Sequence, residues 1–134
     1  MVKIGMFIGL LVLSTVVSAN AQATKHYRAN IGFDFSVGEK SYKAGKYDVR
    51  VDNASILMIE DMDGKKLWVA AATPNAAENG RDATTLIFNR YEDRYFLAKV
   101  VSNEFGSSMK MSADEKRMAK REDLTMKTVS LKVK

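Results

Sequence analysis

The stretch HYRANIGFDFSV, residues 26–37, alternates apolar and polar side chains over almost its whole length. One parity is apolar throughout and comprises Tyr27, Ala29, Ile31, Phe33, Phe35 and Val37. The other parity carries His26, Arg28, Asn30, Asp34 and Ser36. Because successive side chains of a strand point to opposite faces, this pattern predicts a strand with one face in a hydrophobic core and the other in solvent.

Similar runs recur along the chain, and turn-forming residues separate them. Further strands are predicted at residues 40–43, 46–51, 55–60, 66–73, 84–91 and 94–101. Asp63-Gly64 and Glu92-Asp93 mark tight reversals between neighbouring runs. Residues 55–60 are apolar on both parities, so we expect this strand to be buried on both faces. We also expect Pro74 to end the strand before it and to open a mobile loop that reaches Asp82.

The pattern changes after Val101. Residues 102–111 carry few strand signals. Ser112 and Glu115 fit a capping box, in which the Ser hydroxyl and the Glu carboxylate bind free N–H groups at a helix start. A short helix is therefore predicted from Asp114 to about Glu122. Residues 124–133 are strand-like again, and a bulge near Lys127-Thr128 would reconcile their two apolar parities.

The number and spacing of these elements indicate the fold class. Short connections between strands imply antiparallel neighbours. The sequence thus predicts an all-β fold of about seven or eight strands, with one short C-terminal helix. The architecture is either an antiparallel β-sandwich or a small, partly open β-barrel. An outer-membrane barrel fits poorly, because its strands need about ten residues and most of these runs are shorter.

The first residues have the three parts of a secretory signal peptide. Lys3 supplies a positive start, residues 4–17 form an uncharged apolar run, and two Ala-x-Ala sites end at Ala21 and Ala23. About 14 residues span only about 21 Å as a helix, against a bilayer core of about 30 Å. We therefore expect cleavage rather than a retained anchor, with no stable membrane span afterwards. Residues 1–23 are then the signal peptide, and residues 24–134 form a single β-rich domain in the periplasm or outside the cell.

The chain contains no cysteine. It therefore cannot carry a lipid on a cysteine, form a disulfide, or use a thiolate as a nucleophile or metal ligand. The formal net charge of +5 falls to about +4 when Lys3 leaves with the signal peptide. This mildly basic charge is spread along the chain, so it favours anionic neighbours such as envelope polymers only slightly.

Two strings resemble a family of small secreted bacterial β-rich proteins of unknown function. IGFDFSVG (residues 31–38) and AGKYDV (residues 44–49) are similar to the family's F-x-F-x-V-G strand and A-G-x-Y-x-V segment. LIFNRYEDRYFL (residues 86–97) is similar to its F-x-R-Y-x-D-x-Y-F-L hairpin. The resemblance covers about the first two thirds of the mature chain. It implies a β-rich exported domain and no particular chemistry.

Two features point weakly to a metal or a catalytic base. His26 is the only histidine of the chain, and it lies near the predicted mature terminus, where geometry is poorly held. The string EDMDG, residues 60–64, resembles part of a calcium loop. However, the twelfth position counted from Asp61 is Ala72, where such a loop needs a bidentate Glu. We therefore expect a turn at residues 60–64 and neither a metal nor a cofactor.

A second candidate is the hairpin tip between two predicted strands. It comprises Arg90, Tyr91, Glu92, Asp93, Arg94 and Tyr95. Neighbouring residues on a strand or turn point apart, so these carboxylates do not suit a catalytic pair that must flank a bond. We expect a tip laced by Arg–carboxylate pairs and cross-strand Tyr contacts. A role of this tip in recognition is the alternative.

A third candidate is a basic sector of the predicted helix, formed by Lys116, Arg117, Lys120 and Arg121. Such a sector could meet a phosphate or a lipid headgroup. Four acidic residues dilute its field, so a solvated face is the simpler expectation: Asp114, Glu115, Glu122 and Asp123. Nucleic-acid binding has little support, because no aromatic residues are interleaved with these cations.

These features predict an exported, non-catalytic β-domain that binds or supports a component of the cell envelope or the cell's surroundings. Two alternatives stay open. The interior could carry a small apolar ligand, because sequence cannot separate a filled core from a cavity. A hydrolase built on carboxylates, Lys, Tyr or Ser has the least support.

Overall fold

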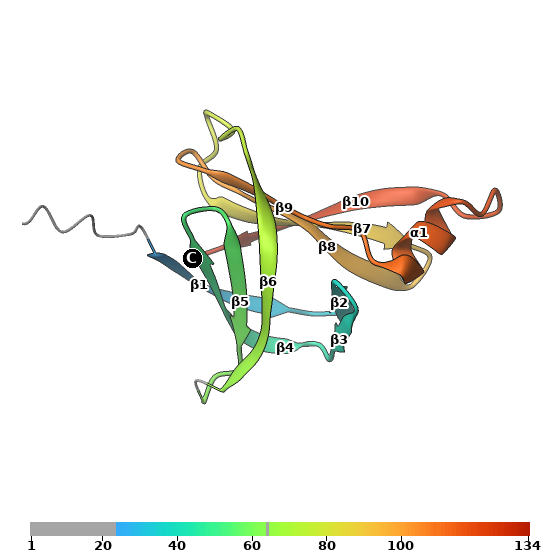
Figure 1. Ribbon diagram of the computed structural model, residues 1–134, viewed down its shortest axis with the longest axis horizontal. Coiled ribbons are helices and arrows are strands. Elements are labelled where there is room, and N and C mark those ends of the chain that lie inside the picture. Colours follow the sequence, from blue (N-terminus) through green and yellow to red (C-terminus); the bar gives the residue numbers. More distant parts are fainter. Residues whose placement is uncertain (1–23, 64) are drawn as a thin grey trace, which may run out of the picture.

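The computed structural model describes residues 24–63 and 65–134, so the predicted signal peptide lies outside the described residues. The described chain is an all-β fold with one short helix, and its mixed sheet is not closed into a barrel (Figure 1). The helix is α1, Ala113–Ala119. The strands are β1 Thr24–Ile31, β2 Phe35–Val37, β3 Lys40–Tyr42, β4 Gly45–Asp52, β5 Ile56–Glu60, β6 Lys66–Asn75, β7 Thr84–Tyr91, β8 Arg94–Val101, β9 Gly106–Met109 and β10 Met126–Val133.

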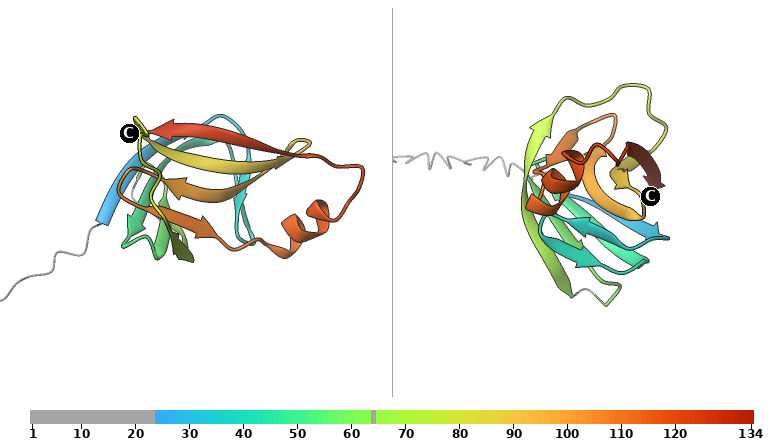
Figure 2. Two further views of the ribbon diagram at one scale, coloured as in Figure 1. Left: turned by 90° about the horizontal axis from the view of Figure 1, so that it is seen from above. Right: turned by 90° about the vertical axis from the view of Figure 1, so that its right-hand side faces the viewer.

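The strands form two antiparallel layers that share β6, which is the predicted sandwich (Figure 2). One layer is β1, β4, β5 and the first part of β6. The other is β10, β7, β8, β9 and the last part of β6. The change of layer falls after Ala71, because Ala71 still pairs with β5 while Ala72 pairs with β9. Arg28 N donates to Lys134 O at 2.8 Å, which links β1 to the end of β10 at the open side of the sheet.

The β2–β3 hairpin is attached to the second layer by the one parallel pairing in the described chain. Phe35 of β2 lies opposite Tyr95 of β8, and Ser36 lies opposite Phe96. β9 occupies the other half of the same β8 edge, from Lys99 to Val101. This arrangement departs from the antiparallel neighbours that we predicted, and it brings β2 and β3 to the end of the sandwich that carries the β7–β8 turn.

The apolar parity of the opening stretch faces the core, as predicted, but the stretch is two strands rather than one. β1 ends at Ile31 and β2 begins at Phe35, with Gly32 to Asp34 between them. The Phe35 ring lies 5.8 Å from the Phe88 ring in an edge-to-face arrangement. The buried core comprises Ala29, Ile31, Phe35, Val37, Tyr47, Val49, Val51, Leu57, Ile59, Leu86, Phe88, Leu97, Val100 and Val133.

Two predictions about individual strands were wrong. Leu57 and Ile59 of β5 are buried, but Ile56 is 40 % exposed, so β5 has one solvent face. Its outer face is open because the sandwich has only two layers. Pro74 does not end β6 but lies within it, opposite Ser107. Beyond Ala71 the other side of β6 is a sheet edge, where a residue without an N–H group is tolerated.

Residues 102–111, which gave few strand signals, contain the strand β9. The Ser107 side chain is fully buried and donates its hydroxyl to Ala54 O at 2.8 Å. This bond ties β9 to the turn between β4 and β5. β9 is short and polar, and although it follows β8 directly in the chain, its other partner β6 lies about thirty residues earlier. Its strand character therefore depends on tertiary pairing, which local alternation does not reveal.

The predicted bulge near Lys127-Thr128 was wrong, because β10 pairs with β7 in one continuous register. Val129, Leu131 and Val133 face the core, while Met126 is 47 % exposed. The apolar residues before Val129 therefore do not need to share its face. The register shifts that do occur lie in the β7–β8 pair and in the β5–β6 pair.

Ser112 caps α1 as predicted: its hydroxyl accepts the N–H of Glu115 at 3.1 Å. The helix is shorter than the predicted span and ends at Ala119. Glu39 Oε1 accepts a different first-turn donor, the N–H of Ala113, at 3.1 Å. In the described chain, no helix combines the length and apolar character that a membrane crossing requires.

Replacing Gly106 by alanine should destabilise the fold by about 1–3 kcal/mol. A Cβ at this position would lie 2.7 Å from Ala76 O and 3.2 Å from Asn75 O, and these backbone oxygens cannot move without disturbing β6. Urea denaturation measures the loss. Gly32→Ala is the control, because nothing lies within 4 Å of the added Cβ there. Equal stability of the two variants would contradict the close approach of β9 to residues 75 and 76.

Candidate functional site

The predicted hairpin tip is a two-residue turn at Glu92 and Asp93, with Tyr91 opposite Arg94. Glu92 has a φ of 55°, a left-handed conformation that tight hairpin turns favour. Arg90 Nε donates to Glu92 O at 2.6 Å and so braces this conformation. The Glu92 and Asp93 side chains are exposed at the tip. The predicted tight reversal is therefore confirmed.

Tyr91 does not belong to the exposed tip. Its side chain is 3 % exposed, and its hydroxyl donates to Glu115 Oε2 of α1 at 3.1 Å. Asn89 Nδ2 donates to the same carboxylate oxygen at 3.0 Å. Glu115 is itself only 3 % exposed, so a buried carboxylate holds α1 against β7. Glu115, which the predicted capping box pairs with a free N–H group at the helix start, instead accepts these two hydrogen bonds from β7.

Arg94 and Tyr95 complete the hairpin, and both are held by neighbours outside it. Arg94 Nη2 lies 3.5 Å from Asp114 Oδ2 of α1. The Tyr95 ring stacks on Phe33 with centroids 3.9 Å apart. The ion pair of Arg94 thus joins the hairpin to α1 and does not lace the tip as predicted, and the ring contact of Tyr95 joins the hairpin to the segment between β1 and β2.

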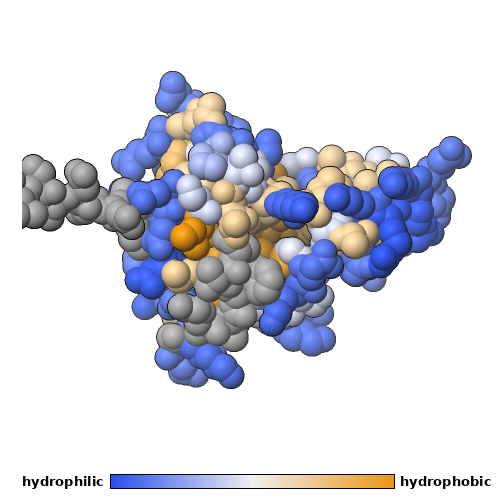
Figure 3. All heavy atoms as spheres, in the orientation of Figure 1, coloured by the Kyte–Doolittle hydropathy of each residue, from blue (hydrophilic) through white to orange (hydrophobic). Residues whose placement is uncertain are grey.

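The basic residues of α1 lie at the same end of the molecule, where Figure 3 shows mainly hydrophilic side chains. Arg117 pairs with Asp114, and Arg121 Nη2 lies 2.6 Å from Asp123 Oδ2. The hydrogen bond between Arg121 and Asp123 raises the pKa of the guanidinium and lowers the pKa of the carboxyl group. Lys116 and Lys120 are exposed. Half of the predicted basic face is therefore neutralised by neighbouring acids.

A hollow of about 430 Å³ separates the β7–β8 turn from α1. It is lined by Glu92, Asp93, Arg94, Asp114, Arg117, Met118 and Arg121. Three acidic and three basic side chains face it, so the charges balance. The fold thus brings the predicted hairpin and the predicted basic sector together, although no pattern in the sequence indicates that they meet.

A second hollow, of about 270 Å³, lies on the other side of the same turn, between it and the β2–β3 hairpin. We call it the β2–β8 hollow. It is lined by Asp34, Phe35, Ser36, Ser41, Tyr42, Lys43, Asp93, Arg94 and Tyr95. Asp93 and Arg94 line both hollows. Sequence reasoning missed its β2–β3 side, because only the parallel pairing of β2 with β8 creates it.

Polar groups of the β2–β8 hollow are arranged in pairs. Lys43 Nζ lies 3.6 Å from Asp34 Oδ2, and the Ser36 and Ser41 hydroxyl oxygens lie 3.2 Å apart. Asp34 Oδ1 also accepts the N–H of Ala44 at 2.8 Å, which fixes the carboxylate. The Tyr42 hydroxyl is buried and has no hydrogen-bond partner among the described residues. An unpaired buried hydroxyl is rare in folded proteins and calls for an explanation.

Tyr42 and Tyr91 should lose their phenol protons late in an alkaline titration. Burial, followed by the charge of Tyr47, raises the pKa of Tyr42 to about 12. Burial, followed by Glu115, raises the pKa of Tyr91 to about 12. The unfolded chain ionises near pH 10, so between pH 10 and pH 12 it binds fewer protons than the folded chain. The free energy of unfolding therefore keeps the full contribution of these two tyrosines below pH 10 and decreases as the pH rises toward 12.

Ultraviolet absorbance of tyrosinate and urea denaturation at each pH measure the two effects. The chain has five tyrosines, so each one contributes a resolvable share of the absorbance change. Tyr42→Phe and Tyr91→Phe should each remove one late component. Burial also raises the pKa of Tyr47, so part of the late change should remain after both substitutions. A late change as large as in the unsubstituted protein would show that other tyrosines are responsible.

The weaker sequence candidates have structural partners. His26 is exposed on β1, and its Nε2 accepts from Arg50 Nε at 3.2 Å. Asp61 Oδ1 accepts the N–H groups of Asp63 and Lys65 at 3.0 and 2.9 Å, which forms the β5–β6 turn. A turn is present between β5 and β6 as predicted, and Gly64 of the predicted Asp63-Gly64 pair lies outside the described residues. In the part of the chain that the structure describes, no group of three His, Asp or Glu side chains suits a metal ion.

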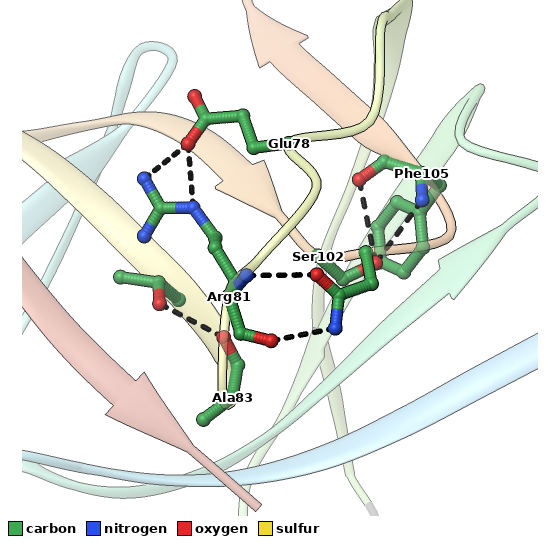
Figure 4. A network of polar contacts seen from close by, with 7 residues as sticks. Glu78, Arg81, Ala83, Ser102 and Phe105 are labelled. Atoms are coloured by element: carbon green, nitrogen blue, oxygen red, sulfur yellow. Dashed lines mark hydrogen bonds and ion pairs between the residues drawn. The ribbon is translucent and has the colours of Figure 1, made fainter.

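The loop after Pro74, which we expect to be mobile, is tied to the β8–β9 connection at its far end (Figure 4). Arg81 N donates to Asn103 Oδ1 at 2.9 Å, and Asn103 Nδ2 donates back to Arg81 O at 2.5 Å. Arg81 Nε donates to Glu78 Oε2 at 2.5 Å, and Glu78 N donates to Ser102 O at 3.1 Å. This network holds the loop at the end of the sandwich opposite α1.

Comparisons with protein-family models, with curated proteins and with solved structures found no match to this chain.

Proposed function

We propose that the protein is an exported, non-catalytic β-domain that binds a partner in the cell envelope or outside the cell. The observation that carries the proposal is the meeting of three distant segments at one end of the sandwich. The β2–β3 hairpin, the β7–β8 turn and α1 enclose two adjacent hollows that share Asp93 and Arg94. We call this region the α1 end (Figure 1).

The side chains at the α1 end are held in place before any partner arrives. Arg94 is held by Asp114, and Tyr95 is held by Phe33. A preformed surface loses little side-chain entropy on binding, which favours recognition. Arg90 and Arg94 are already engaged by Glu92 O and by Asp114, which supports a binding role over a catalytic one.

Export is proposed from the sequence of the first 23 residues. The apolar run of residues 4–17 and the two Ala-x-Ala sites support removal of the segment during secretion. The intact mass of the protein recovered from the periplasm or the medium should correspond to a chain that starts at Gln22 or Thr24. A secreted chain that still starts at Met1, or a chain retained in the cytosol, would contradict export.

Carriage of an apolar ligand in the interior has less support than binding at the α1 end. The Phe35 ring lies 5.4 Å from both the Tyr42 and the Tyr47 rings, and Phe88 lies 5.0 Å from Phe33. These rings occupy the space between the layers that a carried ligand would need. A ligand that co-purifies with the protein and is lost on denaturation would nevertheless favour the carrier.

Site-specific crosslinking in intact cells tests binding at the α1 end. The chain has no cysteine, so an introduced cysteine is a unique attachment point for a thiol-reactive photo-crosslinker. Asp93→Cys places the crosslinker at the turn shared by the two hollows, and Ser130→Cys places it on the exposed face of β10. We expect a light-dependent product of higher mass with Asp93→Cys alone. Equal products from both variants, or none from either, would overturn the proposal.

A further inference from the structure

We propose that the β2–β8 hollow binds one neutral sugar residue of a larger saccharide. This inference rests on the proposed function, because it names the class of partner for one part of the α1 end. The argument uses the charge balance of the rim, the hydroxyl groups of the floor, and the size and walls of the hollow.

Two ion pairs lie at the rim of the hollow, and the exposed carboxylate of Asp93 has no ion-pair partner among the described residues. Asp34 pairs with Lys43 at 3.6 Å, and Arg94 pairs with Asp114 at 3.5 Å. A singly charged ligand would compete with the like-charged member of an ion pair for the opposite charge. It would also be repelled by that like-charged member. A sugar hydroxyl accepts from the Lys43 ammonium and donates to the Asp34 carboxylate at the same time. A neutral ligand with several hydroxyl groups therefore fits this rim without breaking an ion pair.

The floor of the hollow supplies further hydroxyl groups. Ser36 is buried in β2 and shares one hydrogen bond with Ser41 of β3, so their oxygens keep free lone pairs and one hydroxyl proton. The buried Tyr42 hydroxyl lacks a partner among the described residues, which is unfavourable for the free protein. A sugar hydroxyl would supply that partner after a small shift of the half-buried Tyr42 ring.

The walls and the volume favour a single sugar ring. The half-buried Tyr42 side chain, together with the part of Tyr95 that Phe33 and Arg90 leave uncovered, provides apolar surface against which the C–H groups of a sugar ring can pack. At about 270 Å³ the hollow is slightly smaller than typical pockets for small ligands, which begin at roughly 300 Å³. The remaining residues of a saccharide would continue outward over the exposed Asp93.

Nuclear magnetic resonance of the isotope-labelled protein, purified as the cell processes it, tests the inference. The probes are glucose, galactose, N-acetylglucosamine and their disaccharides, with glycine and inorganic phosphate as charged competitors. We expect a saturable shift of backbone amide signals from β2, β3 and the β7–β8 turn with at least one neutral sugar. Saturation by phosphate or glycine at these signals, or no saturable shift with any sugar, would overturn the inference.

Matched substitutions locate the binding. Ser41→Ala should weaken sugar binding about ten-fold, the usual effect of one hydrogen bond to a ligand. Tyr42→Phe should weaken it several-fold without lowering the melting temperature. Ser130→Ala and Tyr27→Phe, which lie outside the hollow, should leave affinity unchanged. Equal affinity of all four variants would overturn the assignment to the hollow.

The two proposals fail separately. If the Asp93→Cys variant crosslinks but no sugar binds, the sugar-binding inference is wrong and the proposal of partner binding at the α1 end stands. Absence of both overturns both.

Discussion

Replacing Phe88 by alanine lowers the free energy of unfolding by about 3–5 kcal/mol. Phe88 is completely buried at the centre of β7, and its ring lies 5.0 Å from Phe33 and 5.8 Å from Phe35. The substitution removes the aromatic surface that packs against Phe33 and Phe35 and leaves a cavity that the surrounding strands cannot close. Because small domains are stable by only about 5–15 kcal/mol, the variant loses a large share of its stability.

Urea denaturation followed by tryptophan fluorescence measures this loss, and Phe105→Ala is the matched control. Phe105 is only partly buried at the edge of the core, and its ring is 6.3 Å from Tyr27. We expect it to cost about half as much, since less apolar area leaves the interior. Equal losses for the two variants would contradict the central place of Phe88 in the core.

Replacing Glu115 by alanine destabilises the fold by about 2–4 kcal/mol. The substitution leaves the Tyr91 hydroxyl and the Asn89 amide, both now bonded to Glu115 Oε2, without their acceptor. These donors lie where α1 covers the end of β7, so the polar groups either stay unpaired or draw water beneath the helix. We therefore expect α1 to detach before the sheets unfold, with early hydrogen exchange at residues 113–119.

Two further variants separate this bond from helix propensity. Lys116→Ala changes an exposed residue of the same helix and should alter stability by less than about 0.5 kcal/mol. Glu115→Gln keeps an oxygen that can accept both hydrogen bonds and should cost less than Glu115→Ala. A double-mutant cycle with Tyr91→Phe should give a coupling energy of about 1 kcal/mol or more. A coupling of zero would contradict the hydrogen bond between the two side chains.

Local alternation predicted the strands that have one face in the core and one in solvent. Val49 and Val51 of β4 are buried and their neighbours are not, so periodicity alone located that strand. The capping hydroxyl of Ser112 was also predictable, because it acts on a backbone group three residues away. Ser107 shows the limit, since its burial follows from its position between β6 and β8 and not from its neighbours in sequence.

The candidate site was half predictable for the same reason. Residues 90–95 form a dense group of charges and tyrosines at a predicted turn, and that turn is present. What sequence could not supply was the environment of that turn. The parallel pairing of β2 with β8 and the burial of Glu115 against Tyr91 both join residues far apart in the chain. Each hollow has one wall from the hairpin and another from a segment that only tertiary structure brings near.

The contact between β1 and the end of β10 has a consequence for how the chain acquires its fold. A polypeptide emerges amino end first from a ribosome or a translocation channel, so Arg28 appears about a hundred residues before Lys134, to which it is bonded. Likewise, β2 cannot form its parallel pairing until β8 has emerged. Folding dominated by such distant pairings is slow, on the order of milliseconds to seconds. During that interval the open edge of β1 can pair with other chains. We therefore expect the domain to remain unfolded until its last strand has emerged, and to depend on holding chaperones until then.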